Sequence, residues 1–149
     1  MMGERELEHY LYEHIPLSLA MQVSVIDVQD DGVTLRAPLA PNINHTSTIF
    51  GGSASAVAIL SAWSLVHVYM KNAGVPCSIV IQRNSMEYEK PIYGSFTARS
   101  YIAQPEHLQL FMKTLLRRGR ARISVSSLLE YEGKIVGKFE GDFVVIKAN

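Results

Sequence analysis

Hydrophobic positions recur every three to four residues in several stretches of the chain, and this period predicts helices there. The first stretch is Glu4–His14, which Pro16 ends. A much longer one begins at Gly51 and ends at residues 72–74, where a glycine closes it. Residues 105–116 also have helical spacing, although the same stretch could begin a strand. We therefore expect one long helix and two shorter ones.

Most of the remaining chain has strand character. The predicted strands are Met21–Val28, Val33–Ala37, Cys77–Glu89, Ser95–Ala103, Arg120–Tyr131 and Lys134–Ile146. Turn signals at Asp30-Asp31-Gly32 and Glu132-Gly133 join two pairs of them as hairpins. With no internal repeat or linker, residues 1–149 fit one domain. The order predicts an α+β domain, an antiparallel sheet wrapped around one long central helix.

The long helix carries no ionisable acid or base other than a histidine over most of its length. Residues 51–70 contain no Asp, Glu, Lys or Arg, but they include two glycines, four serines and His67. Many of the apolar residues are alanine, which is a weak membrane signal. A helix that is apolar on nearly all sides in such a chain is usually buried, so we expect a core helix and not a membrane span.

Composition narrows the classes of function. Lys and Arg number 14, Asp and Glu also number 14, and the net charge of zero argues against non-specific nucleic-acid binding. Cys77 is the only cysteine and lies in an apolar run, which favours a buried thiol. The five histidines show no zinc-ligand spacing, so no metal is expected. The charged N-terminus lacks the apolar segment of a signal peptide, and we expect a cytoplasmic protein.

The stretch NHTSTIFGGSASAVAILSAW, residues 44–63, has the layout of a binding site. Gly51 and Gly52 would let a substrate carbonyl approach the backbone closely. Their N–H groups lie at a helix start, where donors are unpaired and the dipole favours negative charge. Asn44 could add a side-chain amide to this oxyanion site. The alternative is that the glycines only allow the helix to pack closely against the sheet.

This loop and the order of elements resemble the hotdog fold of acyl-CoA and acyl-ACP enzymes, where ACP is acyl carrier protein. In many hotdog thioesterases an Asn precedes a Gly-Gly pair by seven residues, as Asn44 precedes Gly51 here, and the turn Pro91–Gly94 also fits. More narrowly, IPLSLAM, PLAPNINHTSTIFGGS and ARIS are similar to a single-domain, thioesterase-like branch. That branch includes malonyl-ACP decarboxylases, which supply acetyl-ACP to initiate fatty acid biosynthesis. The resemblance implies a homodimer or larger homo-oligomer with the site between subunits.

The sequence departs from the common thioesterase pattern at two positions. Phe50 stands where those enzymes often have His, and Ile59 stands where they often have Asp or Glu. Hydrolysis needs a base or a nucleophile, and the usual base is missing. Decarboxylation of a malonyl thioester needs only donors for the enolate oxygen and a dry pocket for the carboxylate. We therefore expect malonyl-ACP decarboxylation, with two alternatives: an acyl thioesterase whose base comes from elsewhere, or a non-catalytic acyl-thioester binding module.

The expected site residues follow from this resemblance and from the loop. The catalytic candidates are Asn44 and Gly52, and the substrate-binding candidates are Thr48, Phe50, Gly51, Ser53, Ile59 and Trp63. His45 and Ser53 are the nearest candidates for the proton donor to the enolate carbon. Ser61 and Ser64 are expected to bond back to a carbonyl one helical turn earlier. His67 is expected to be a satisfied core or interface histidine.

One cluster of charge stands out in an otherwise mixed sequence. Arg117, Arg118 and Arg120 could dock an acidic carrier protein or the phosphates of a pantetheine group. The alternative is a solvated turn that enters a strand. No cofactor of the protein's own is expected, because the substrate would arrive on the phosphopantetheine of ACP or CoA.

Overall fold

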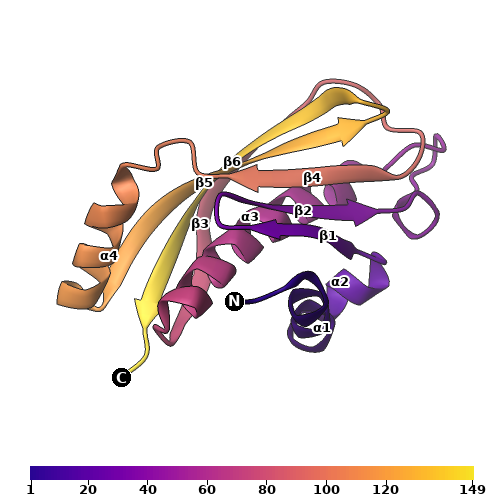
Figure 1. Ribbon diagram of the computed structural model, residues 1–149. Helices are drawn as coiled ribbons and strands as arrows, with labels where there is room; N and C mark the ends of the chain where they lie inside the picture. Colours follow the sequence, from indigo (N-terminus) through magenta and orange to yellow (C-terminus); the bar gives the residue numbers. More distant parts are fainter.

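The computed structural model describes all residues, 1–149, as one curved antiparallel sheet and four helices (Figure 1). The helices are α1 Glu4–His14, α2 Pro16–Ala20, α3 Gly51–Ala73 and α4 His107–Arg118, with a short 3-10 turn, η1, at Ala40–Asn42. The strands are β1 Ser24–Gln29, β2 Gly32–Ala37, β3 Cys77–Tyr88, β4 Phe96–Tyr101, β5 Arg120–Tyr131 and β6 Lys134–Lys147. Their order across the sheet is β1-β2-β4-β5-β6-β3. The predicted α+β architecture is confirmed.

The N-terminal region differs from the sequence-based prediction. Helix α1 ends at His14 as predicted, but Pro16 then begins a second short helix, α2, that was not predicted. Proline suits a first helical turn because its missing N–H would have no partner there. The extra turn continues through Met21, whose N–H donates to Leu17 O at 2.9 Å, so β1 starts at Ser24 and not at Met21. Of the two readings of residues 105–116, the helix is correct.

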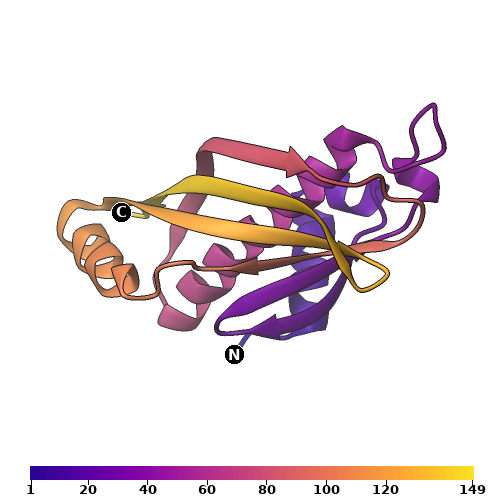
Figure 2. The same cartoon turned by 90° about the horizontal axis from the view of Figure 1, so that it is seen from above.

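Helix α3 is the centre of the core. Figure 2 shows it crossing one face of the sheet. By length and composition it could span a membrane, but 67% of its most apolar 18-residue window is buried inside the domain. Ser61 Oγ donates to Val33 O at 2.8 Å and lies 3.0 Å from Ala98 O, and Ser127 Oγ donates to Ala58 O at 2.8 Å. The expectation that Ser61 and Ser64 bond back within the helix is wrong: Ser61 joins the helix to the sheet, and the buried Ser64 Oγ has no hydrogen-bond partner.

Helix α4 lies where the sheet is incomplete. Strand β4 pairs with β5 only from Ser126 to Glu130, so the first half of β5 has no neighbour on that side. In Figure 1, α4 runs beside this open half, and it buries Phe111 and Leu115 there. Gly119, in the left-handed conformation at φ 74°, then reverses the chain into β5. Both views place α4 and the loop before α3 at opposite ends of the molecule.

The two edges of the sheet differ in how far other parts of the chain cover them. At the β1 edge, Glu8 of α1 accepts a hydrogen bond from Val25 N–H at 2.9 Å, and the Tyr12 hydroxyl donates to Val23 O. Side chains of α1 therefore occupy donors and acceptors on that edge. Strand β3 pairs only with β6, and its other edge is uncovered along 12 residues. Val80 on β3 is 52% exposed, so a long, partly apolar edge is free for a further strand.

Candidate functional site

The loop before α3 is held in shape by the amide of Asn44. Asn44 Oδ1 accepts hydrogen bonds from Thr46 N–H at 2.9 Å, from Thr46 Oγ1 at 3.0 Å and from Thr48 N–H at 3.0 Å. Its Nδ2 donates to Thr48 Oγ1 at 2.8 Å and to Ile49 O at 3.4 Å. In the single chain the side chains of Asn44 and Thr48 therefore form a hydrogen bond with each other. A direct contact of either one with substrate stays a prediction.

A second asparagine fixes the base of the same loop. Asn42 is buried, and its Nδ2 donates to Met21 O at 3.0 Å and to Pro38 O at 2.8 Å. Its backbone carbonyl accepts from Phe50 N–H at 2.7 Å. These bonds fix the residue from which α3 starts. Asn42 thus has a positioning role, which the residue type suggests because loop asparagines often bond to backbone.

The start of α3 presents free backbone donors. The first hydrogen bond of the helix runs from Ala54 N–H to Phe50 O at 3.0 Å, and no side chain caps this end. The N–H groups of Gly51, Gly52 and Ser53 consequently have no acceptor. Unpaired N–H groups at a helix start bind anionic oxygen. The donor array inferred from the glycine pair is therefore present.

Aromatic side chains lie close to both glycines at the start of α3. A Cβ at position 52 would collide with the Phe50 ring, which lies against the Gly52 backbone and is 56% exposed. A Cβ at position 51 would lie 3.5 Å from the Tyr88 ring, and the Tyr88 hydroxyl donates to Gly51 O at 3.2 Å. A Cβ at position 51 would make an ordinary contact with the sheet, and one at position 52 would displace only the exposed Phe50 ring, so close packing against the sheet requires neither glycine. Tyr88, at the end of β3, is a site residue that sequence reasoning missed.

The other predicted wall residues lie farther along the helix. At 1.5 Å per residue, Ile59 is about 12 Å from Gly51 and Trp63 about 18 Å. Gly51 lines a cleft of 290 Å³ together with Tyr88, whereas Trp63 lines a separate cavity of 620 Å³. Ile59 is half-buried between them. One chain therefore brings together Asn44, Thr48 and the residues up to Ser53, but it does not bring Trp63 to them.

The cavity at Trp63 is lined by stacked rings, and we call it the aromatic pocket. It is formed by Tyr10, Trp63, His67, Met70, Cys77 and Ile79, with Lys71 also on its lining. The His67 ring centroid lies 4.3 Å from that of Tyr10 and 4.9 Å from that of Trp63. Trp63 Nε1 donates to Ile79 O at 3.0 Å, which fixes the indole against β3. The pocket therefore has rigid, planar walls.

His67 is buried but not satisfied, which corrects the expectation from sequence. It is 7% exposed, and its Nε2 has no hydrogen-bond partner. Burial, with smaller contributions from Lys71 and His14, lowers the pKa of His67 to about 4, so the imidazole is uncharged at neutral pH. Cys77 is half-buried, and burial raises the pKa of its thiol although Lys71 acts in the opposite direction. A thiol of this kind is a poor nucleophile.

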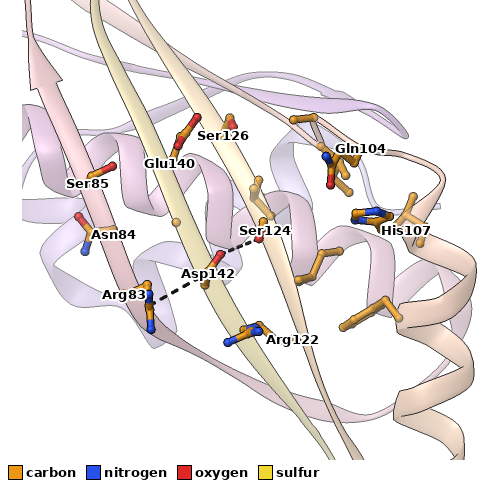
Figure 3. A pocket seen from close by; sticks show the side chains of 17 residues that line it. Arg83, Asn84, Ser85, Gln104, His107, Arg122, Ser124, Ser126, Glu140 and Asp142 are labelled. Atoms are coloured by element: carbon orange, nitrogen blue, oxygen red, sulfur yellow. Dashed lines mark hydrogen bonds and ion pairs between the residues drawn. The ribbon is translucent and has the colours of Figure 1, made fainter.

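The arginine cluster lies at the end of α4. Arg117 and Arg118 are in its last turn and Arg120 begins β5, all three exposed. The outer face of the sheet beside α4 carries a polar groove of 530 Å³ (Figure 3). There Asp142 accepts from Ser124 Oγ at 2.6 Å and lies 3.9 Å from Arg83 Nε. The groove has charges of both signs.

A sheet wrapped around a helix without carboxylates, with free N–H donors at the helix start, is the arrangement of hotdog-fold proteins of the acyl-thioester class. The chain belongs to the YiiD_C family, described as "Putative thioesterase (yiiD_Cterm)", whose model matches residues 4–147. It is similar to protein OLEI01261 from Chlorobaculum tepidum TLS, of unknown function (29% identity, 97% of this chain and 94% of that chain, TM-score 0.91). It is also similar to a "putative thioesterase" from Shewanella oneidensis (26% identity, 96% of each chain, TM-score 0.85). A "Probable Thioesterase", PA5026 from Pseudomonas aeruginosa, shares the fold at 19% identity and TM-score 0.80 over 97% of this chain and 96% of that chain.

The uncharged state of His67 predicts a pH dependence of stability. The unfolded chain takes up a proton on this imidazole near its ordinary pKa of 6.5, whereas the folded protein does so only near 4. The free energy of unfolding should therefore fall as the pH drops from about 6.5 to 4. In His67→Phe this contribution is absent, so urea unfolding at pH 7, 6 and 5 should show a shallower decline. His9→Phe, at an exposed histidine, is the control, and an unchanged slope in His67→Phe would contradict the assignment.

Proposed function

We propose that the protein is a malonyl-thioester decarboxylase that converts malonyl-ACP to acetyl-ACP and so supplies the starter for fatty acid synthesis. The family and its structural relatives support action on acyl thioesters in general. One observation carries the narrower proposal: α3 begins with free N–H donors and has no carboxylate anywhere along Gly51–Ala73. The site has N–H donors that can polarise a thioester carbonyl, but it lacks the base that thioesterases usually carry on this helix.

The proposed reaction uses these donors directly. The thioester carbonyl oxygen accepts hydrogen bonds from the N–H groups of Gly51 and Gly52. The bond between C2 and the carboxyl carbon breaks, CO2 leaves, and the electron pair moves to the thioester oxygen as an enolate. A proton from water then reaches C2 and gives the acetyl thioester. A carboxylate on the helix would repel the malonyl carboxylate, so its absence favours this substrate.

Thioester hydrolysis is the second candidate. It is favoured by the printed descriptions of the family and of the Shewanella protein. In that reaction the same donors would hold a tetrahedral intermediate, and the base would come from outside α3. His45, exposed in the loop, is the nearest titratable group in sequence. A binding module without catalysis would use the same donors for the ground-state carbonyl.

We also propose that the protein is a homodimer in which two β3 strands pair through their free edges. A two-fold axis makes this pairing antiparallel, so Cys77 of one protomer lies near the level of the partner's Tyr88. Tyr88 contacts Gly51, so the partner's donor array comes to the aromatic pocket of the first protomer. Gly51 and Trp63 lie about 18 Å apart in one chain, but in this dimer Gly51 of the partner subunit would lie near Trp63 of the first protomer.

The arginine cluster fits the same arrangement as a docking surface for ACP. Arg120 on β5 pairs with Ile146 on β6, which pairs with Ser78 on β3. The cluster therefore lies at the β3 end that faces the partner's donor array. Positive charge there would hold an acidic carrier while its arm enters the site.

The reaction can be tested with malonyl-ACP and acetyl-ACP. We expect acetyl-ACP and CO2 from malonyl-ACP with no free thiol from either substrate. Asn44→Ala should reduce kcat by about 10²-fold, the effect of losing one oxyanion donor or its support, while the protein stays folded. Free thiol would establish hydrolysis, and no product would leave binding alone.

Asn44→Asp is the matched control for this prediction. The aspartate keeps an acceptor oxygen for Thr46 and Thr48 but loses the N–H donors. Turnover that survives in Asn44→Asp but not in Asn44→Ala would show that Asn44 acts by holding the loop. Full turnover in both variants would remove Asn44 from the site.

The dimer predicts that a charge at the centre of β3 separates the protomers. Ile81→Lys should give a monomer in light scattering and lose activity, because lysine on an edge strand opposes edge pairing. Ile26→Lys on β1 is the control, since Ile26 is also exposed but lies on the edge that α1 covers. An Ile81→Lys protein that remains dimeric would rule out this interface.

Docking at the cluster predicts a KM effect. Replacing Arg117, Arg118 and Arg120 with Ala should raise KM for malonyl-ACP with little change in kcat, because the changed residues touch only the carrier. Ala at Arg5, Arg36 and Lys134, three exposed cations outside the cluster and outside the cleft at Gly51, is the control for net charge. An unaltered KM in the arginine variant counts against docking at this surface.

A further inference from the structure

The Tyr88 hydroxyl is bonded to the first peptide unit of α3. It donates to Gly51 O at 3.2 Å, and the Tyr88 ring lies beside the Gly51 backbone. Because a peptide bond is planar and trans, the carbonyl of Gly51 and the N–H of Gly52 belong to one rigid unit and point in opposite directions. The Gly52 N–H is one of the free donors at the helix start. Tyr88 therefore holds one end of a peptide group whose other end belongs to the donor array.

The sheet fixes the backbone that carries this hydroxyl. Tyr88 is the last residue of β3, where it pairs with Gly137 of β6. Directly after it, the N–H groups of Glu89 and Lys90 donate to Val136 O at 2.9 Å and 3.2 Å. The end of β3 is therefore tied to β6 on both sides of the last pair, and the hydroxyl reaches the helix start from a rigid element.

Hydrogen bonds at the two ends of one peptide group strengthen each other. A donor on the carbonyl oxygen draws electrons through the unit and makes its N–H more positive. The carbonyl oxygen has two lone pairs, so Gly51 O can accept from Tyr88 without giving up a bond within α3. Gly52 is exposed, so a substrate oxygen can reach its N–H. When negative charge develops on that oxygen, Gly51 O becomes a stronger acceptor for Tyr88, and the coupling favours the transition state over the bound substrate.

We propose that Tyr88 is a positioning residue for the oxyanion site: its hydroxyl orients the peptide between Gly51 and Gly52 and strengthens the Gly52 N–H as a donor. The proposal rests on the proposed function in one respect, that the Gly52 N–H binds the thioester oxygen. It applies equally to an enolate and to a tetrahedral intermediate. The alternative is that the Tyr88 ring only packs against the helix start, and removal of the hydroxyl alone distinguishes the two roles.

Tyr88→Phe keeps the ring and removes the hydroxyl. In this variant kcat for malonyl-ACP should fall about threefold to tenfold, the effect of one hydrogen bond, while KM and the oligomeric state stay unchanged. Tyr93→Phe is the matched control, because Tyr93 is similarly exposed but lies outside the cleft at Gly51. A ring that only packs predicts no change in Tyr88→Phe, and a kcat equal to that of the active wild type would overturn the proposal.

An infrared measurement tests the role of Tyr88 without turnover. The probe is acetonyl-CoA with a ¹³C-labelled carbonyl, a ketone that can be neither hydrolysed nor decarboxylated. Hydrogen bonds from the donor array should lower the C=O stretching frequency of the bound probe below its value in water. Tyr88→Phe should reverse part of this shift, and Tyr93→Phe should leave it unchanged.

The infrared result separates this proposal from the proposed reaction. A wild-type probe without the shift, or a shift of the same size in Tyr88→Phe, would overturn the role of Tyr88 whether or not malonyl-ACP releases CO2. A shift that is reduced in Tyr88→Phe, in a protein that releases no CO2, would support the role of Tyr88 and overturn the proposed reaction.

Discussion

The enclosure of α3 by the sheet is the constraint on which the site depends. A helix buried on most sides cannot carry ionised side chains without partners, and residues 51–70 carry no acid, lysine or arginine. Polar contacts with the sheet come from hydroxyls, as at Ser61 and Ser127. The polar groups that such a helix can offer a substrate are the N–H groups of its first turn. The fold therefore favours stabilisation of an oxyanion over acid–base chemistry on the helix.

Helix α1 has two effects that act together. Through Glu8 and Tyr12 it occupies bonding groups at the β1 edge, which leaves β3 as the edge open to a second copy. Through Tyr10 it also forms one wall of the aromatic pocket. The same short helix thus directs where a partner can add and closes the cavity that this partner would face. Its exposed and buried positions follow the 3.6-residue period, with Leu7 and Leu11 in the core.

Features with a local cause could be predicted from the sequence. The long helix, the six strands and the free N–H groups after Phe50 all follow from periodicity, turn residues and a glycine pair. Helix α2 was missed because Pro16 suits a first helical turn as well as a helix end. Tyr88 at Gly51, Tyr10 on His67 and the unpaired His67 Nε2 depend on contacts between distant segments. No local pattern carries such contacts, so the aromatic pocket could not be anticipated.

The bonds of Asn44 bear on how the donor array works. Oxyanion stabilisation depends on donors that are already fixed when the charge develops. Through Thr46 and Thr48, Asn44 fixes the loop that ends at Phe50, where the helix starts. Its acceptor oxygen is sufficient for that role, whereas a direct contact with substrate would require an Nδ2 N–H to leave Thr48 Oγ1 or Ile49 O. In the proposed reaction the loop would therefore contribute by aligning the Gly51 and Gly52 donors, even while the Asn44 amide stays within the loop.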